Sequence, residues 1–414
     1  MGSSDTAAGP HMSEVRRARF AVAAVFAVHG AVAGNFATRI PWLQERLDIG
    51  AGQLGVALAF PAIGASVAMP LAGRISHRFG ARAALRGLLA LWCASLALPA
   101  VAPGQVALCG ALFVYGATSG MSDVAMNALG VEIEQRLGRS VMSGLHGMWS
   151  AGLLVGSAAG TVAAHAEADG RLHLGVAAAV LVVLGAVACR WVLDVRGAPE
   201  EHPPPRFALP PRSALVIGAI GFCAVFAEGA SLDWSAVYLR DALGSSPGLA
   251  AACTTAFACT MAVARLAGDA VVERFGPVRT VRVGGALATA GGVLVMAAPG
   301  AAVAIAGFGL IGLGIAVVVP LAFAAAGRSG PAPSQSIAGV ATITYTSGLI
   351  APAAMGSVAD LTSLTVSFGL VTALALGLVA GAGVLAGGAP SARGRGAAAS
   401  ARQGGEPARR EHTG

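Results

Sequence analysis

The chain has 414 residues, of which 56% are hydrophobic and only 11% are charged, and its mean hydropathy is +0.73. A soluble domain keeps roughly a quarter of its residues charged, so this composition excludes an ordinary water-soluble enzyme and indicates a surface that faces lipid. All 27 basic residues are arginine and the net charge is +7. This excess indicates contact with anionic lipid headgroups rather than with nucleic acid.

Twelve apolar segments follow one another along the chain, separated by short loops that hold most of the charges. A helix that spans a bilayer needs about 20 mostly apolar residues, and every segment is that long. The sequence therefore predicts an all-α membrane protein with twelve transmembrane helices, over residues 18–43, 52–75, 83–103, 105–131, 141–166, 172–193, 213–243, 247–272, 279–299, 301–327, 337–361 and 365–387.

The distribution of arginine predicts the orientation in the membrane. With a cytoplasmic N-terminus, 23 of the 27 arginines lie on the cytoplasmic side, and four lie on the other: Arg39, Arg46, Arg171 and Arg240. Such a bias follows the positive-inside rule. Because the number of spans is even, we expect both termini in the cytoplasm and a multi-pass protein of a bacterial cytoplasmic (inner) membrane.

Composition also divides the chain into two apolar halves and three polar segments. A proline-rich linker over 194–212 separates an N-terminal six-helix bundle (18–193) from a C-terminal one (213–387). Residues 1–17 consist of what looks like an expression leader, with Met12 as the natural start, and a cytoplasmic N-terminus. Residues 388–414 are expected to form a disordered basic tail in the cytoplasm.

The two halves repeat each other at an offset of about 196 residues. Three pairs of short segments match in the same order: HGA (29–31) with EGA (228–230), LAGRISHRFG (71–80) with LAGDAVVERFG (266–276), and WSAGLLVG (149–156) with YTSGLIAP (345–352). This order indicates duplication of a six-helix unit. A parallel repeat of this kind is typical of transporters whose substrate site lies at the bilayer midplane between the halves.

The loop after the second span resembles the signature of the major facilitator superfamily, G-x-x-x-D-R-x-G-R-R. It reads Gly-Arg-Ile-Ser-His-Arg-Phe-Gly-Ala-Arg over 73–82, with His77 where the signature has Asp. A second copy follows the eighth span, where Arg265 and Asp269 are spaced to pair along the helix. The resemblance implies alternating access, with these loops acting as a cytoplasmic gate that consists of His77, Arg78, Arg82, Arg265, Asp269 and Arg274.

Within the superfamily, the fourth span resembles the fucose-permease-like branch, which carries an acid four residues before an Asn on a glycine-rich helix. Gly120, Asp123 and Asn127 match that pattern. The resemblance implies that Asp123 takes part in proton coupling and in the recognition of a sugar. The alternative is that Asp123 only makes a hydrogen bond between helices.

Carboxylates inside the predicted spans are the candidates for proton coupling: Asp123, Glu228 and Asp233. An ionisable group at the bilayer centre costs about 2.5–3.5 kcal/mol on insertion scales, so it indicates a function or a specific partner. Glu228 and Asp233 are five residues apart, which separates them by about 140° around a helix. We therefore expect one to face the central cavity and the other a neighbouring helix. An ion pair between Asp233 and Arg39 is a competing interpretation.

Polar and aromatic side chains inside the spans are the candidates for binding the substrate. We assign six residues to this site: Asn35, Arg39, Asn127, His146, Trp149 and Tyr345. Two assignments have alternatives, because Arg39 lies near a membrane surface that its side chain can reach and His146 lies near the cytoplasmic end, where it can act in a gate.

These observations predict a proton-coupled secondary transporter of a small organic, sugar-like molecule that works as a monomer by alternating access. A proton-driven efflux antiporter for a metabolite or drug is the alternative, and a non-transporting receptor or scaffold is a third. No cofactor is expected, because a chain without lysine cannot contain the phosphate-binding P-loop and shows no metal-ligand cluster. No pattern indicates a catalytic nucleophile, so we do not expect an enzyme.

Overall fold

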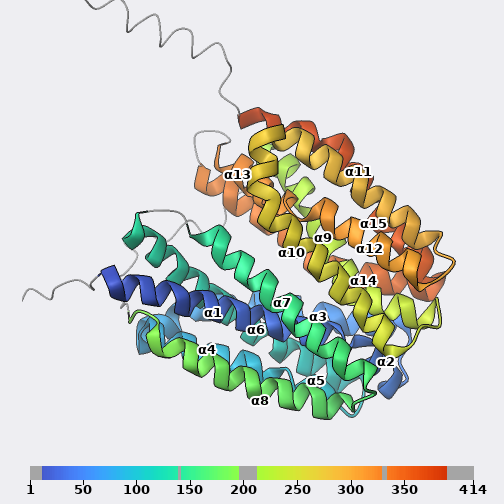
Figure 1. The fold of residues 1–414 in the computed structure, drawn as a ribbon, viewed down its shortest axis with the longest axis horizontal. Helices are drawn as coiled ribbons and strands as arrows, with labels where there is room; N and C mark the ends of the chain where they lie inside the picture. The colour runs from blue at the N-terminus through green and yellow to red at the C-terminus, as the bar shows by residue number, and fades with distance from the viewer. Residues whose placement is uncertain (1–11, 139–140, 195–211, 329–332, 389–414) are drawn as a thin grey trace, which may run out of the picture.

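The computed structural model describes residues 12–138, 141–194, 212–328 and 333–388, and these residues form helices and connecting turns without any strand (Figure 1). The first half contains α1 (Met12–Ala37), α2 (Ile40–Leu47), α3 (Ala51–Phe79), α4 (Ala81–Ser95), α5 (Leu98–Val101), α6 (Gln105–Leu137), α7 (Met142–His165), α8 (Gly170–Ala188) and a short 3-10 helix, η1 (Cys189–Trp191).

The second half has the same order of long helices. It contains α9 (Arg212–Asp241), α10 (Pro247–Phe275), α11 (Pro277–Met296), α12 (Ala301–Ile315), α13 (Val318–Gly327), α14 (Pro333–Leu361), α15 (Leu364–Gly381) and η2 (Ala382–Gly388). Figure 1 shows the two halves as separate bundles, the first coloured blue to green and the second yellow to red.

Ten helical segments of the described residues are long and apolar enough to cross a membrane. Three of these segments are interrupted spans that join α1 to α2, α4 to α5, and α12 to α13. Helices α6 and α14, with 33 and 29 residues, lie in the same bundles and complete the set. The predicted all-α fold with twelve transmembrane helices in two bundles is confirmed.

Each interrupted span breaks within about one turn before a proline: Pro41, Pro99 or Pro320. A proline has no N–H group to donate to the carbonyl four residues earlier, so the helix is released at that point. The first break falls at Thr38 and Arg39, so these two polar residues lie in the turn between α1 and α2.

Equivalent helix pairs pack against each other in the two bundles. The pairs α1–α7, α3–α6 and α4–α8 of the first bundle correspond to α9–α14, α10–α12 and α11–α15 of the second. Between the bundles, α3 lies against α14 and α7 against α10, which is again a related pair of contacts. The fold therefore has the internal pseudo-symmetry that the sequence repeat indicates.

Polar side chains join the two bundles at one end of the molecule. We call the linker end the one at which α8 ends and α9 begins, and the far end the one at which α2 lies. Polar contacts close the far end: Gln44 Nε2 donates to Asp241 Oδ2 (3.0 Å), Arg240 Nε donates to Glu45 Oε1 (2.7 Å), and the hydroxyl groups of Thr161 and Thr255 are 2.8 Å apart.

The polar segments expected from composition fall largely outside the described residues. This applies to 1–11 of the expected leader, 195–211 of the expected linker over 194–212, and 389–414 of the expected tail. Helix α1 begins at Met12, six residues before the expected start of the first span at residue 18.

Candidate functional site

A cavity of about 330 Å³ lies between the two bundles, and both contribute side chains to it. Helices α1, α3, α4, α6 and α7 supply one wall, and α9 and α14 supply the other. The lining residues that can interact with a polar or aromatic ligand are His29, Phe36, Trp92, Tyr115, Ser119, Trp149, Glu228 and Asp233.

The wall from the first bundle is a continuous aromatic surface. The ring centroids of Phe36 and Tyr115 are 4.8 Å apart, and those of Tyr115 and Trp92 are 4.2 Å apart. Trp92 in turn stacks on His29 at 5.1 Å with an interplanar angle of 29°. Trp149 extends this surface from α7. The wall therefore presents aromatic faces, which suit stacking or the binding of a cation.

Hydrogen bonds hold this wall in one arrangement. Trp149 Nε1 donates to His29 Nδ1 at 3.1 Å, so the proton of a neutral His29 ring lies on Nε2. That nitrogen is 3.4 Å from the backbone oxygen of Ser119, to which it donates. Trp92 Nε1 donates to the backbone oxygen of His29 at 3.4 Å. The polar groups of His29 and both tryptophans are thus already occupied.

The wall from the second bundle carries two carboxylates. Arg265 on α10 donates through Nη2 to both carboxylate oxygens of Glu228, at 2.9 and 3.0 Å. The same guanidinium donates through Nη1 to Ser150 Oγ on α7 at 3.1 Å, a contact between the bundles. Asp233 differs, because it makes no hydrogen bond or ion pair with any described residue.

Two expectations about these acids need correction. Glu228 and Asp233 both line the cavity, although their separation around the helix predicts that only one faces it. The reason is that α9 runs along the cavity, so Val225, Gly229 and Leu232 also contribute to the wall. Arg265 pairs with Glu228 on the neighbouring helix and not with Asp269 on its own helix.

Asp123 and Asn127 lie outside the cavity lining, on α6. Asn127 Nδ2 donates to Asp123 Oδ1 at 3.1 Å and to the Asp123 backbone oxygen at 2.9 Å. Both residues continue the helix face of Ser119, which lines the cavity, by one and two turns toward the linker end. Along α6, Asp123 therefore lies between the cavity and the linker end, and its carboxylate accepts a hydrogen bond from its own helix.

The structure places Asn35 and Arg39 in a polar cluster inside the first bundle, apart from the cavity lining. Arg39 Nε donates to His173 Nδ1 at 2.9 Å, and His173 Nε2 is 2.9 Å from Asn35 Oδ1. Both Asn35 and Arg39 are buried. Arg39 accordingly pairs with neither Asp233 nor Glu228. His173, on α8, could not be predicted as a member of this cluster, because no local sequence pattern links it to α1.

The remaining predicted substrate residues are split. Trp149 lines the cavity. His146, one turn earlier on α7, is exposed and packs edge-on against Phe26, with ring centroids 5.3 Å apart. Tyr345 belongs to α14, but its side chain lies outside the described residues. Trp92 and Tyr115 are not among the residues predicted from the sequence, although an aromatic residue in a span rich in Ala and Gly is a usable signal.

Apart from Arg265, which lies beside the cavity, the predicted gate residues lie at the linker end. His77, Arg78, Asp269 and Arg274 are exposed there, and they make no hydrogen bond or ion pair with any described residue. Arg82 Nε donates to the backbone oxygen of Val192 at 2.6 Å, within its own bundle. In the described part of the chain, polar contacts between the bundles thus lie at the far end and at Arg265.

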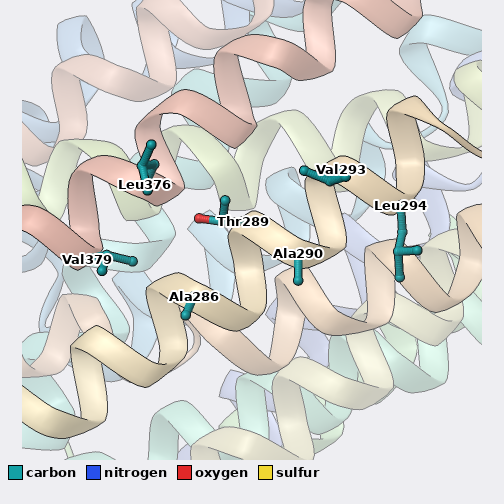
Figure 2. Close-up of a pocket in the computed structure, with 7 residues that line it drawn as sticks. All are labelled: Ala286, Thr289, Ala290, Val293, Leu294, Leu376 and Val379. Atoms are coloured by element: carbon teal, nitrogen blue, oxygen red, sulfur yellow. The ribbon is translucent and has the colours of Figure 1, made fainter.

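A second, larger hollow of about 580 Å³ opens on the outer face of the second bundle, between α11 and α15 (Figure 2). Aliphatic side chains such as Val293 and Leu376 line it and are about half exposed. Its single hydroxyl group, on Thr289, donates to the backbone oxygen of Gly285 at 2.8 Å. This hollow has the composition of a lipid-facing surface, so the central cavity is the better candidate for a substrate site.

Solved structures share this architecture. The fold superposes on a nucleoside transporter, NupG, with a TM-score of 0.69 and 12% identity, covering 89% of this chain and 99% of that one. A bacterial homologue of the human lysosomal transporter Spinster, in an inward-facing and occupied conformation, also has a TM-score of 0.69, with 13% identity and coverage of 91% and 97%. At such identities the likeness shows the fold alone.

Sequence relatives identify the family. The chain is 36% identical over 335 residues to an uncharacterised MFS-type transporter of Yersinia pestis, covering 79% of this chain and 84% of the relative. It is 33% identical over 327 residues to an uncharacterised transporter of Sinorhizobium fredii, covering 78% and 86%. The family profile described as Major Facilitator Superfamily matches residues 22–352. The chain therefore belongs to the major facilitator superfamily of membrane transporters.

Proposed function

We propose that the protein is a proton-coupled secondary transporter that carries a small polar organic molecule through the central cavity by alternating access. The single observation that carries this proposal is the cavity between the bundles, which contains two membrane-embedded carboxylates, one of them without a bonding partner among the described residues. Carboxylates in such a position are typical of proton relays and substrate sites in transporters.

The arrangement of contacts between the bundles supports alternating access. Side chains join the bundles at the far end, while the predicted gate residues at the linker end are exposed. This asymmetry is what a carrier needs when its cavity opens to one side at a time. With the arginine bias along the chain, it supports an inward-facing state of a carrier whose linker end is cytoplasmic.

The proposal predicts that the two ends move in opposite directions when Asp233 takes up a proton. Spin labels at Ala83 and Val283 report the linker end, and labels at Val106 and Ala302 report the far end, in a background without the six native cysteines. Lowering the pH from 8 to 5 should change the two distances in opposite directions in proteoliposomes, measured by pulsed electron paramagnetic resonance. Asp233→Asn should reduce this response.

Equal distances at pH 8 and pH 5 at both ends would contradict proton-coupled alternating access. If both distances instead changed in the same direction, general loosening of the bundles would explain the result better than a transport cycle. Asp48→Asn serves as the matched control, because it removes an exposed carboxylate from a left-handed backbone position that Asn tolerates equally well.

A further inference from the structure

The central cavity has two chemically different walls. The first bundle supplies aromatic faces from Trp92, Tyr115 and Trp149, and the second supplies Asp233 and the Glu228–Arg265 pair. A ligand held between the bundles therefore touches an apolar, electron-rich surface on one side and a carboxylate on the other. Both walls border the same cavity of about 330 Å³.

A balance of charge singles out Asp233. Glu228 is neutralised by Arg265, and the hydrogen bond from Trp149 to Nδ1 keeps the His29 ring in its neutral form. Tyr115 contributes a phenol to the lining. Among the described groups that face the cavity, Asp233 is thus the carboxylate without a cationic partner. A charge withdrawn from water needs a partner or a proton to become neutral.

The cavity offers a neutral polyhydroxylated ligand few polar groups that are not already bonded to a described residue, namely the hydroxyl groups of Tyr115 and Ser119 and the carboxylate of Asp233. Polar groups of Trp92, Trp149 and His29 are bonded to one another or to the backbone, and Arg265 holds Glu228. A sugar would need several free donors and acceptors to replace its hydration. Aromatic faces and one carboxylate that has no cationic partner among the described residues instead match a cation, which tryptophan attracts more strongly than other aromatic residues do.

Building on the proposed function, we propose that the transported molecule is a small monovalent organic cation with an apolar or aromatic body, which exchanges with one proton at Asp233. Its positive centre lies at the Asp233 carboxylate, and its body packs against Trp149, Trp92 and Tyr115. When the cation enters, the proton leaves the carboxyl oxygen for water, so the charge of the cavity does not change. The cavity volume is at the small end of the ~300–1,000 Å³ range of ligand sites, which suits a body of one ring.

Phenyltrimethylammonium and phenyl β-glucoside are suitable probes, because both carry one phenyl ring and only the first carries a charge. Calorimetric titration of the purified full-length protein should show binding of the cation and none of the glucoside. Affinity for the cation should fall as the pH is lowered, by no more than about tenfold per pH unit, since one proton competes for one carboxylate. Glu228, Arg265, His29 and Tyr115 are the other titratable groups of the cavity region.

The variants separate charge from shape. Asp233→Asn should weaken cation binding by about 30-fold or more, the loss expected for a desolvated charged contact, and should remove the pH dependence. Trp149→Phe should bind the cation more weakly than the wild type and more tightly than Trp149→Leu, because the aromatic face is retained. Asp48→Asn should behave as the wild type. A thermal unfolding midpoint close to the wild type shows that each variant is folded.

Proton exchange has its own readout. The probe is a quaternary ammonium ion without a titratable proton, so any proton released on binding comes from the protein. Binding enthalpies in two buffers of different ionisation enthalpy should differ at low pH and agree at high pH, and Asp233→Asn should abolish the difference. Proton release that persists in Asp233→Asn assigns the exchange to another group and overturns the proposal.

Different results would overturn the cationic substrate and the transport proposal. The proposal of a cationic substrate would be overturned if the wild type bound the glucoside and Asp233→Asn bound it equally well. It would also be overturned if neither of the two probes bound. In both cases, opposite movements of the two ends between pH 8 and pH 5 would leave the transport proposal standing. If the cation bound but the two ends did not move, the binding would support a cation site and the lack of movement would contradict alternating access.

Discussion

Arg265 makes four hydrogen bonds from one guanidinium group and connects its own helix, α10, with three other parts of the fold. It bonds twice to Glu228 on α9, once to Ser150 on α7, and once to the backbone oxygen of Ala316 between α12 and α13, the last at 3.4 Å. Because both charges are largely removed from water, with side-chain exposure of 22% each, the loss of one leaves the other uncompensated.

We therefore expect Glu228→Gln and Arg265→Gln each to lower the unfolding free energy by about 1–3 kcal/mol, and the double variant to lose less than the sum of the two. Thermal unfolding of the purified single and double variants tests this coupling. Additive losses would show that the pair contributes nothing beyond its separate side chains. Asp269→Asn is the matched control on α10, because Asp269 is exposed and makes no ion pair with the described residues.

For single residues, the sequence indicates which side chains are candidates for a site, but not which other side chains they bond to. Trp149, Glu228 and Asp233 line the cavity. They can be selected from the sequence because aromatic and acidic residues in an apolar span indicate a function or a specific partner. Asn35 and Arg39 belong to a different cluster because His173, 134 residues after Arg39, bonds to both. Such a partner is brought near by the packing of α8 on α1, which no local pattern describes.

Glycine residues let α1 and α7 approach until their backbones touch. A Cβ atom at Gly152 would overlap the backbone oxygen of Ala27, and one at Gly156 would overlap that of Ala31. From α1, Gly30 and Gly34 face the backbone of α7 in the same way. Small residues at such contacts allow the close van der Waals packing that joins helices in lipid. This contact positions His29 and Trp149 for the hydrogen bond at the cavity.

Two Gly→Ala substitutions on α7 test how close α1 and α7 must approach. Gly152→Ala should lower the thermal unfolding midpoint, because overpacking typically costs about 1–3 kcal/mol and the obstructing atoms are backbone. Gly144→Ala should leave it unchanged or raise it slightly, because nothing lies within 4 Å of the added Cβ and Ala favours helix by up to about 1 kcal/mol. Equal shifts for the two variants would mean that the α1–α7 approach tolerates an added methyl group.

The membrane spans can be predicted from the sequence more fully than the residues of the site, because a span depends on many residues together. Hydropathy summed over about 20 residues marks a span, so the twelve expected segments coincide with twelve helical spans to within a few residues at most ends. The interruptions near Pro41, Pro99 and Pro320 are visible in the sequence only as single prolines, and Pro61, Pro70 and Pro352 lie inside unbroken helices. Whether a proline interrupts a helix therefore depends on neighbours that sequence patterns do not reveal.

At the scale of the whole molecule, few polar contacts hold the far end closed. Arg240 bonds to Glu45 across the bundles and also donates to the backbone oxygen of Ser245, while Gln44 holds Asp241. Glu45 is about half exposed, and exposed pairs of this kind contribute only about 0.2–1 kcal/mol. A contact of that size does not determine the fold, but it is large enough to alter the balance between two conformations of similar free energy.

Arg240→Glu places a third carboxylate beside Glu45 and Asp241, so repulsion replaces the attraction between the bundles. We expect the distance between labels at Val106 and Ala302 to increase and the distance between labels at Ala83 and Val283 to decrease, as the far end opens and the linker end closes. Restoring opposite charges with Glu45→Arg in the same chain should reverse both changes. In about 1 M salt, where screening acts over about 3 Å, the single variant should approach the wild type. If the far end opened while the linker end stayed in place, the bundles would not move as rigid bodies about the central cavity.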